Sequence, residues 1–133
     1  MSFDNLGLNK SLIEILEKEN FKAPYPIQEK AIPEIIKGKD VLGIAQTGSG
    51  KTASYVLPIV SSTAITKGPK TRKIDVLVLV PTRELAQQVK EVFTVFKKGS
   101  LSPIKTIAVY GGVSINPQML SLIHISEPTR RTP

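Results

Sequence analysis

The feature that most constrains this chain is a glycine-rich segment that lies between a short apolar run and a helix-forming stretch. Residues 45–52 read Ala-Gln-Thr-Gly-Ser-Gly-Lys-Thr and directly follow the apolar residues 41–44. Gly48 and Gly50 can adopt positive φ angles, which turn backbone N–H groups inward around an anion. The helix that follows would place its positive N-terminal end at the same anion. The segment therefore predicts a loop that binds phosphate groups.

Two side chains at the end of this loop predict its ligand. Lys51 supplies a positive charge for the outer phosphates of a nucleoside triphosphate, and the Thr52 hydroxyl is a suitable ligand for Mg²⁺. We therefore expect Lys51 and Thr52 to be the catalytic residues of the loop, with Thr52 as the metal ligand. The predicted nucleotide-binding residues of the loop are Ala45, Gln46, Thr47, Gly48, Ser49, Gly50, Lys51 and Thr52.

One position departs from the general form of such loops, since Ala45 stands where glycine is usual. The alternative interpretation is a Gly/Ser turn followed by an ordinary surface lysine. The order of apolar run, loop, Gly-Lys-Thr and helix favours the phosphate loop.

Composition limits the class of protein. With 133 residues the chain has the length of one domain at most, and 18 Lys and Arg against 11 Asp and Glu give a net charge of +7. This balance favours contact with nucleic acid, although solubility alone would also explain it. The absence of cysteine excludes disulfides and thiolate metal sites. No apolar stretch is long enough to span a membrane and no signal peptide is recognisable, so we expect a cytoplasmic protein.

Hydrophobic spacing predicts three helices besides the one that follows the loop. The first covers residues 11–20, with Ser11 as its cap, and the second covers residues 27–37, with Pro33 inside it and Gly38 as its stop. The third covers residues 83–98 and ends at Gly99. The residues expected to face inward are Leu12, Ile13 and Leu16 in the first helix, Ile27, Ala31, Ile35 and Ile36 in the second, and Leu85, Val89, Val92, Phe93 and Phe96 in the third.

Apolar runs predict strands at residues 41–44, 76–80 and 104–110. The second run is continuously apolar, which is typical of a strand that is covered on both faces. Residues 61–73 are polar and basic and indicate an exposed connector. Because strands alternate with helices, the sequence predicts an α/β fold with a mostly parallel sheet and helices on both faces.

Several motifs in this order resemble the N-terminal motifs of DEAD-box ATP-dependent RNA helicases. They are Phe3, then residues 21–28 (Phe-Lys-Ala-Pro-Tyr-Pro-Ile-Gln), then residues 45–52, then residues 81–86 (Pro-Thr-Arg-Glu-Leu-Ala), then Gly111 and Gly112. In this family Ala45 is the usual first residue of the loop. Residues 1–4 and 110–118 further resemble the bacterial RhlE-type subgroup. The resemblance implies an incomplete RecA-like P-loop NTPase domain over residues 1–119, with the Q motif at about residues 1–29.

The resemblance implies that Gln28 recognises adenine, that Phe21 packs against the base and that Phe3 supports this segment. An amide offers both a donor and an acceptor, which suits the N6 and N7 edge of adenine. The alternative for Gln28 is a residue that caps the backbone of its own helix. Tyr25 and Asn20 depart from the family pattern, which usually has Thr and Gly at these positions.

The resemblance also implies contacts with the sugar-phosphate backbone of single-stranded RNA. The residues concerned are Pro81, Thr82, Arg83, Gly111 and Gly112. Such binding is independent of sequence and sensitive to salt. Without the resemblance, Arg83 and Glu84 are equally well explained as a solvated first turn of a helix. Lys67, Lys70, Arg72 and Lys73 are better explained as a solvated loop than as RNA contacts.

The last part of the chain departs from the helicase pattern. Residues 120–133 match the translation of a sequencing adapter, so we interpret them as a non-native tail in which His124 has no role; the alternative is a genuine helix with a polar end. The excess of basic residues remains without this tail.

The sequence contains neither the Asp-Glu-Ala-Asp motif nor the second domain with the arginine finger that the family uses to hydrolyse ATP. The expected function is therefore that of an ATP-dependent RNA helicase, present as a fragment that is inactive alone. The alternatives are a non-catalytic ATP- or RNA-binding module and another P-loop NTPase, such as a transporter ATPase.

Overall fold

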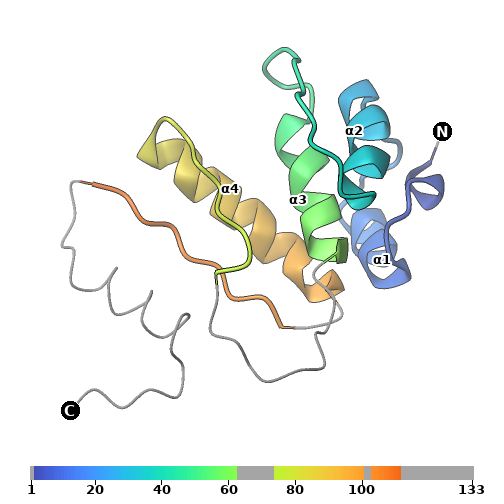
Figure 1. Cartoon of the computed structure of the whole chain (residues 1–133). Coiled ribbons are helices and arrows are strands. Elements are labelled where there is room, and N and C mark those ends of the chain that lie inside the picture. Colours follow the sequence, from blue (N-terminus) through green and yellow to red (C-terminus); the bar gives the residue numbers. More distant parts are fainter. Residues whose placement is uncertain (1, 63–73, 101–102, 112–133) are drawn as a thin grey trace. The chain divides into compact units, whose positions relative to one another are not determined.

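The computed structural model describes residues 2–62, 74–100 and 103–111 (Figure 1). Its elements are the 3₁₀ helix η1 (Phe3–Asn5), the helices α1 (Lys10–Lys18), α2 (Pro26–Ile36), α3 (Lys51–Ser62) and α4 (Arg83–Phe96), and the 3₁₀ helix η2 (Lys97–Gly99). The chain divides into two compact units. The first contains Met1–Ile65 and Val92–Ile104, and the second contains Thr66–Glu91 and Lys105–Pro133.

The first helix begins two residues earlier than its sequence signal indicates. Asn9, not Ser11, is the N-cap of α1, and its Oδ1 accepts a hydrogen bond from the N–H of Leu12 at 2.9 Å. Both residues are good N-caps, so local preference did not decide between them. The Asn9 N–H in turn donates to Ser61 Oγ at 3.0 Å, which joins this cap to the end of α3.

Helix α1 ends in a Schellman motif. The N–H of Phe21 donates to the Leu16 carbonyl and the N–H of Asn20 donates to the Glu17 carbonyl. This motif requires a left-handed residue, and Asn20 takes that role with φ +63°. Because an αL position favours glycine and tolerates asparagine, the geometry explains both the usual Gly of the helicase pattern and the Asn found here.

Helix α2 ends in the same way, at the predicted residue. Gly38 has φ +82° and donates to the Ile35 carbonyl, while Lys39 donates to the Glu34 carbonyl. Gly38 is thus the helix stop that the sequence predicts.

The inward face of α2 differs from the prediction. Ala31 is buried as expected, but Ile27, Ile35 and Ile36 are only partly buried, and Gln28 and Ile32 occupy the core instead. The reason is that α2 packs along α3, and this contact fixes which side of α2 turns inward.

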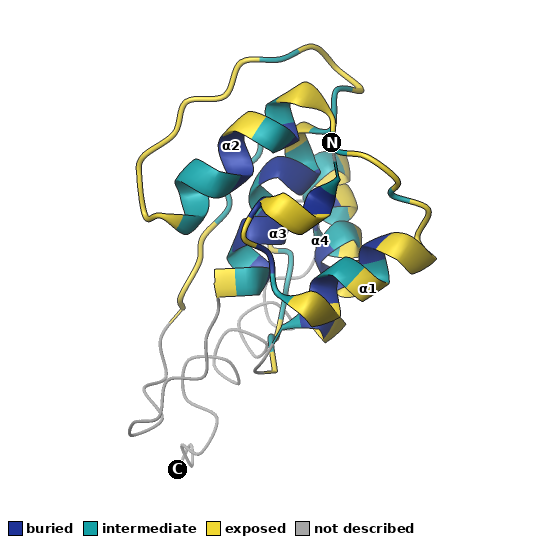
Figure 2. Ribbon diagram, turned by 90° about the vertical axis from the view of Figure 1, so that its right-hand side faces the viewer, coloured by how far each residue is buried: buried dark blue, intermediate teal, exposed yellow. Residues whose placement is uncertain are grey.

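The core of the first unit joins α1, α2 and α3 (Figure 2). The largest fully buried side chains are Leu12, Leu16, Ile32, Leu57, Gln28, Val56, Val60 and Pro58. Helix α1 also packs closely on η2, because a Cβ placed on Gly99 would lie only 2.8 Å from Leu12 Cα. Helix α4 follows its prediction well, with Val89, Phe93 and Phe96 buried and Leu85 and Val92 partly buried.

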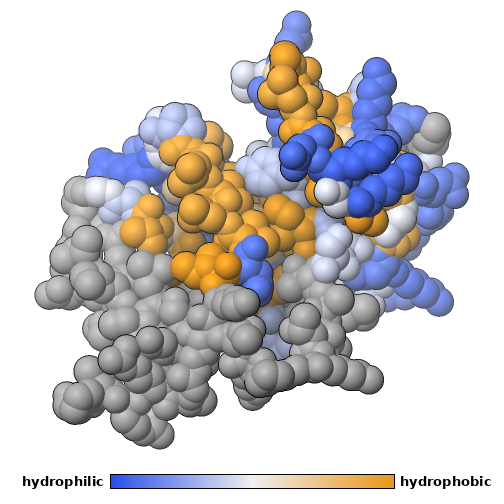
Figure 3. Space-filling view, viewed as in Figure 1, coloured by the Kyte–Doolittle hydropathy of each residue, from blue (hydrophilic) through white to orange (hydrophobic). Residues whose placement is uncertain are grey.

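The three predicted strands are not strands in the part of the chain that the structure describes. Leu42 is 87% exposed and Leu79 is 84% exposed, and Figure 3 shows hydrophobic side chains at the surface over both segments. Residues 76–80 are therefore not covered on both faces in this structure, and the predicted sheet is not confirmed. A strand satisfies its backbone by pairing with a neighbour, and the described residues of these three segments carry no strand assignment.

The structure also bears on the predicted connector and on the expected absence of a membrane-spanning helix. The predicted connector at residues 61–73 begins later than expected, because α3 continues to Ser62; residues 63–73 lie outside the described residues, as do Gly112 and the tail at 120–133. No helix within the described ranges is long and apolar enough to cross a membrane.

Candidate functional site

The glycine-rich segment forms the predicted loop in front of α3. The N–H of Ser49 donates to the Gln46 carbonyl at 3.2 Å, and the Ser49 hydroxyl donates to the same carbonyl. Gly48 lies within this turn with φ +81°, and Gly50 follows with φ +82°. Both glycines therefore adopt the positive φ angles that the sequence predicts.

Helix α3 begins directly after the loop. Lys51 is its first residue and is exposed, and the first helical hydrogen bond runs from the N–H of Ser54 to the Gly50 carbonyl at 3.2 Å. The N–H groups of the first helical turn have no partner within the helix, and the helix dipole makes this end positive. Loop, lysine and helix start thus have the arrangement that suits bound phosphates.

Thr52 lies in the first turn of α3 and interacts with Tyr55. Burial raises the pKa of the Tyr55 hydroxyl, and a side-chain hydrogen bond with Thr52 partly opposes this shift. The two residues are three positions apart, so their side chains lie on the same face of the helix. A hydroxyl oxygen in this position fits the hard oxygen ligands that Mg²⁺ prefers. In the described ranges, no cluster of three or more His, Cys, Asp or Glu residues suggests a metal site made by protein side chains alone.

Gln28 connects the start of α2 to the glycine-rich loop. Its side chain is only 1% exposed. Its Oε1 accepts a hydrogen bond from the Tyr25 N–H at 3.0 Å, which is the capping role considered as the alternative for this residue. Its Nε2 donates to the Gly50 carbonyl at 3.2 Å. One amide therefore ties the N-terminus of α2 to the loop residue that precedes Lys51.

Phe21 takes part in an aromatic cluster. Its ring centroid lies 6.3 Å from that of Phe3 and 5.4 Å from that of Phe96, the latter in an edge-to-face arrangement. Edge-to-face rings at this separation attract each other beyond the effect of burial. Phe3 and Phe96 thus fix the position of the Phe21 ring.

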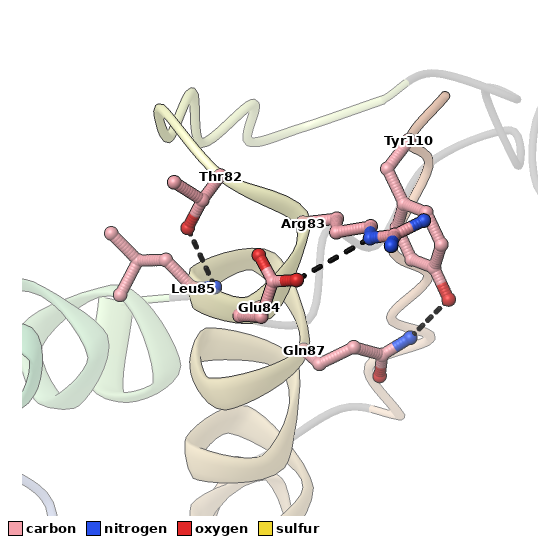
Figure 4. Close-up of polar contacts among 6 residues, drawn as sticks. All are labelled: Thr82, Arg83, Glu84, Leu85, Gln87 and Tyr110. Carbon is pink, nitrogen blue, oxygen red and sulfur yellow. Dashed lines mark hydrogen bonds and ion pairs between the residues drawn. The ribbon is translucent and has the colours of Figure 1, made fainter. Parts of the chain in front are cut away.

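In the second unit, two of the predicted RNA-contact residues, Thr82 and Arg83, lie at the start of α4 (Figure 4). Thr82 caps this helix, because its Oγ1 accepts a hydrogen bond from the Leu85 N–H at 3.1 Å. Arg83 is exposed and its Nε lies 3.3 Å from Glu84 Oε1. Pro81 and Gly111 are also exposed.

One contact in this unit has no signal in the sequence. Gln87 Nε2 donates to the Tyr110 hydroxyl at 2.6 Å, which joins the first part of α4 to the residue before Gly111 (Figure 4). The two residues lie 23 positions apart, and neither belongs to a motif that predicts their pairing. The cap at Thr82, in contrast, was recognisable as a threonine at a helix start.

Most of this chain is similar in sequence to known proteins. The family model described as DEAD/DEAH box helicase matches residues 25–130. The chain belongs to the DEAD/DEAH box helicase family.

Individual members of the family match over nearly the whole chain. The DEAD-box ATP-dependent RNA helicase RhpA of Helicobacter pylori is 44% identical over 117 residues, which are 88% of this chain and 22% of the relative. The ATP-dependent RNA helicase DeaD of Buchnera aphidicola is 46% identical over 122 residues, which are 92% of this chain and 19% of the relative. The chain thus spans about a fifth of the length of these curated helicases.

Solved structures agree with this assignment. A DEAD box protein from the hyperthermophile Methanococcus jannaschii superposes with a TM-score of 0.79 at 33% identity, covering 92% of this chain and 32% of that protein. The RNA helicase Prp28 from Chaetomium thermophilum, bound to ADP, gives a TM-score of 0.74 at 32% identity, covering 91% and 29%. The described residues therefore have the fold of part of a DEAD-box helicase domain.

Tyr25 stands where the family pattern usually has Thr, and the structure shows how this difference affects the N-cap of α2. Tyr25 is the N-cap residue of α2 and has no side-chain hydrogen bond to the helix. A Thr at this position, followed by Gln three residues later, has the spacing of a capping box. In this chain only the Gln28 half of such a box is present.

Proposed function

We propose that the chain is the ATP-binding part of an ATP-dependent RNA helicase and binds ATP with Mg²⁺ at residues 45–52. The observation that supports this proposal is the hydrogen bond from Gln28 Nε2 to the carbonyl of Gly50, the residue that precedes Lys51. The ADP bound to the related Prp28 structure also supports an adenine nucleotide. Lys51 would contact the outer phosphates, and Thr52 would hold Mg²⁺, which neutralises phosphate charge.

Nucleotide titrations test this proposal. Isothermal titration calorimetry of the chain with Mg·ATP should give a binding curve that Lys51→Ala weakens about tenfold or more, since a hydrogen bond to a charged group contributes about 1.5–3 kcal/mol. Lys30→Ala, an exposed lysine on α2, is the matched control and should bind as the unchanged chain does. Equal affinity of the unchanged chain and Lys51→Ala would contradict the proposal.

Adenine recognition by Gln28 and Phe21 is a separate part of this function. We expect ATP to bind more tightly than GTP, because the amide suits the N6 and N7 edge of adenine. Binding would require Gln28 to share or exchange its bonds to Tyr25 and Gly50. Gln28→Ala should remove the preference for ATP over GTP. If this variant still prefers ATP, other residues recognise the base.

We propose that the second unit contacts the backbone of single-stranded RNA through Pro81, Thr82, Arg83, Gly111 and Gly112. The names of the related RNA helicases support this class of ligand. The exposed Arg83 supplies positive charge, and Gly111 leaves room for a close approach, since a Cβ placed on it would meet nothing within 4 Å. Fluorescence anisotropy with labelled single-stranded RNA should show weaker binding for Arg83→Ala and for higher salt.

We also propose that these 133 residues bind ATP without hydrolysing it. Phosphoryl transfer needs a carboxylate that holds the metal and an arginine that offsets charge, and the sequence contains no Asp-Glu-Ala-Asp motif. A phosphate-release assay with and without RNA tests this. RNA-stimulated release that Lys51→Ala abolishes would overturn the proposal of an inactive fragment.

We propose that the protein is cytoplasmic.

We also propose that three segments of this chain form strands of a parallel sheet. Residues 41–44, 76–80 and 104–110 carry exposed apolar side chains, among them Leu42, Leu77 and Val109, which a sheet packed between helices would bury. Hydrogen exchange would test the sheet. If these segments form strands, their amides should exchange as slowly as those of α3; fast exchange would rule the strands out in this chain.

A further inference from the structure

The ring of Tyr25 lies against the last glycine of the phosphate loop. A Cβ placed on Gly50 would be 2.6 Å from Tyr25 Cδ2 and 2.4 Å from Gln28 Nε2, so these two side chains leave no room beyond the glycine itself. Tyr25 is 53% exposed, and it is the residue at which this chain departs from the usual Thr of the family. Its ring therefore packs on the loop with one part and faces solvent with another.

Capping of α2 does not explain this tyrosine. Tyr25 is the N-cap residue of α2, but its side chain makes no hydrogen bond to the helix. Residues that cap well have a short side chain with an oxygen that reaches the N–H groups of the first turn. The position of the ring on Gly50 is the interaction that tyrosine gains and threonine would lack.

Gly50 is the loop residue whose restraint matters for phosphate binding. It directly precedes Lys51, its φ is +82°, and its carbonyl accepts hydrogen bonds from the Ser54 N–H and from Gln28 Nε2. Glycine loses more conformational freedom on ordering than any other residue. Contacts that already hold it in place reduce the entropy that ligand binding would cost.

The other glycine of the loop has no side chain packed against the position where a Cβ would lie. Gly48 also has a positive φ, but a Cβ placed on it would meet nothing within 4 Å. The contacts of Tyr25 and Gln28 thus act on the Gly50 end of the loop, where the N–H groups of the first turn of α3 begin.

We propose that Tyr25 is a positioning residue for the phosphate loop. Its ring holds Gly50 in the conformation that binds a triphosphate, whatever base the triphosphate carries. This inference rests on the proposed function, namely that the loop binds ATP. It assigns the ring to the polyphosphate part of the ligand and not to the base.

The test compares Mg·ATP with Mg·tripolyphosphate, which has no base, by isothermal titration calorimetry of the 133-residue chain. Tyr25→Phe keeps the ring and should bind both ligands as the unchanged chain does. Tyr25→Thr removes the ring and should weaken both ligands by the same factor, about five- to tenfold, which is the scale of ordering one backbone residue. Tyr25→Ser repeats the test with a smaller side chain.

The Tm of the variant distinguishes a role of Tyr25 in positioning the loop from a role in stabilising the fold. Tyr25→Thr supplies the missing half of the capping box, so its Tm should rise while its affinity for tripolyphosphate falls. A loss of affinity in a more stable variant cannot come from a loosened fold.

Two outcomes would overturn the inference. If Tyr25→Thr weakens ATP but not tripolyphosphate, the ring contacts the base; if it binds both ligands as the unchanged chain does, the ring has no role in binding. In both cases the unchanged chain still binds ATP, so the proposed function stands. If the unchanged chain binds neither ligand, the proposed function is wrong and the inference falls with it.

Discussion

The side-chain amide nitrogen of Gln28 lies 3.2 Å from the carbonyl oxygen of Gly50, 22 residues further along the chain, and this hydrogen bond joins the starts of α2 and α3. Gly50 is also the acceptor of the first helical hydrogen bond of α3. Since the Gln28 oxygen accepts from the N-cap residue of α2, a change in this amide acts on both helices at once.

Replacing Gln28 should destabilise the first unit. Gln28→Leu removes both hydrogen bonds from a buried position and leaves the Tyr25 N–H without this partner, so the free energy of unfolding should fall by about 1–3 kcal/mol. Urea denaturation followed by circular dichroism measures this. Gln88→Leu, an exposed glutamine on α4, is the control and should stay within about 0.5 kcal/mol. A Gln28→Leu variant as stable as this control would show that the two bonds add nothing.

Alanine substitution should distinguish the two glycines of the loop. Gly48→Ala meets open space and suffers only from its positive φ, which costs about 1–2 kcal/mol. Gly50→Ala adds the collisions with Gln28 and Tyr25, so it should lose clearly more stability and also weaken Mg·ATP binding. Gly38→Ala, with φ +82° and no neighbour within 4 Å, is the matched control outside the loop. Equal losses at all three positions would mean that the packing on Gly50 relaxes at no cost.

Local patterns predicted the helices and the loop well. The spacing of Leu12 and Leu16, or of Phe93 and Phe96, follows from the helix period alone, and the Gly-Lys-Thr motif marks the start of α3. These features depend on neighbours in the sequence, which is why they can be derived from it.

Tertiary contacts were the part that the sequence did not reveal. The buried Gln28 was not expected in the core, because periodicity selects apolar residues and α2 packs on α3 through a different face. The pairing of strands depends on segments that are distant in the sequence, and the three predicted segments carry no strand assignment among the described residues. The signal for Gln28 was present nonetheless, since a Gln near the start of a helix can cap the backbone of that helix, which was the alternative considered for this residue.

Asn20→Gly should stabilise the chain. Asn20 has φ +63° at the end of α1, where glycine has no Cβ penalty. We expect the free energy of unfolding to rise by about 0.5–1 kcal/mol, which thermal denaturation would show as a higher Tm. Lys30→Gly places the same residue within α2 and should lower stability by about 1 kcal/mol. A destabilised Asn20→Gly variant would indicate that the Asn20 side chain makes a contact that outweighs the backbone term.

The acid titration of Glu34 should depend on Lys39 more than on Lys37. The hydrogen bond and charge of Lys39, 2.9 Å away, hold the pKa of Glu34 below its ordinary value, and the charge of Lys37, 3.8 Å away, adds to this. Because the folded pKa is lowered, the ion pairs stabilise the fold above the ordinary pKa of glutamate, about 4.3, and this contribution disappears as the pH falls through the folded pKa. Carboxyl carbon chemical shifts should therefore give a higher Glu34 pKa in Lys39→Met than in Lys37→Met. The reverse order, or no change in either variant, would show that the 2.9 Å ion pair does not persist in solution.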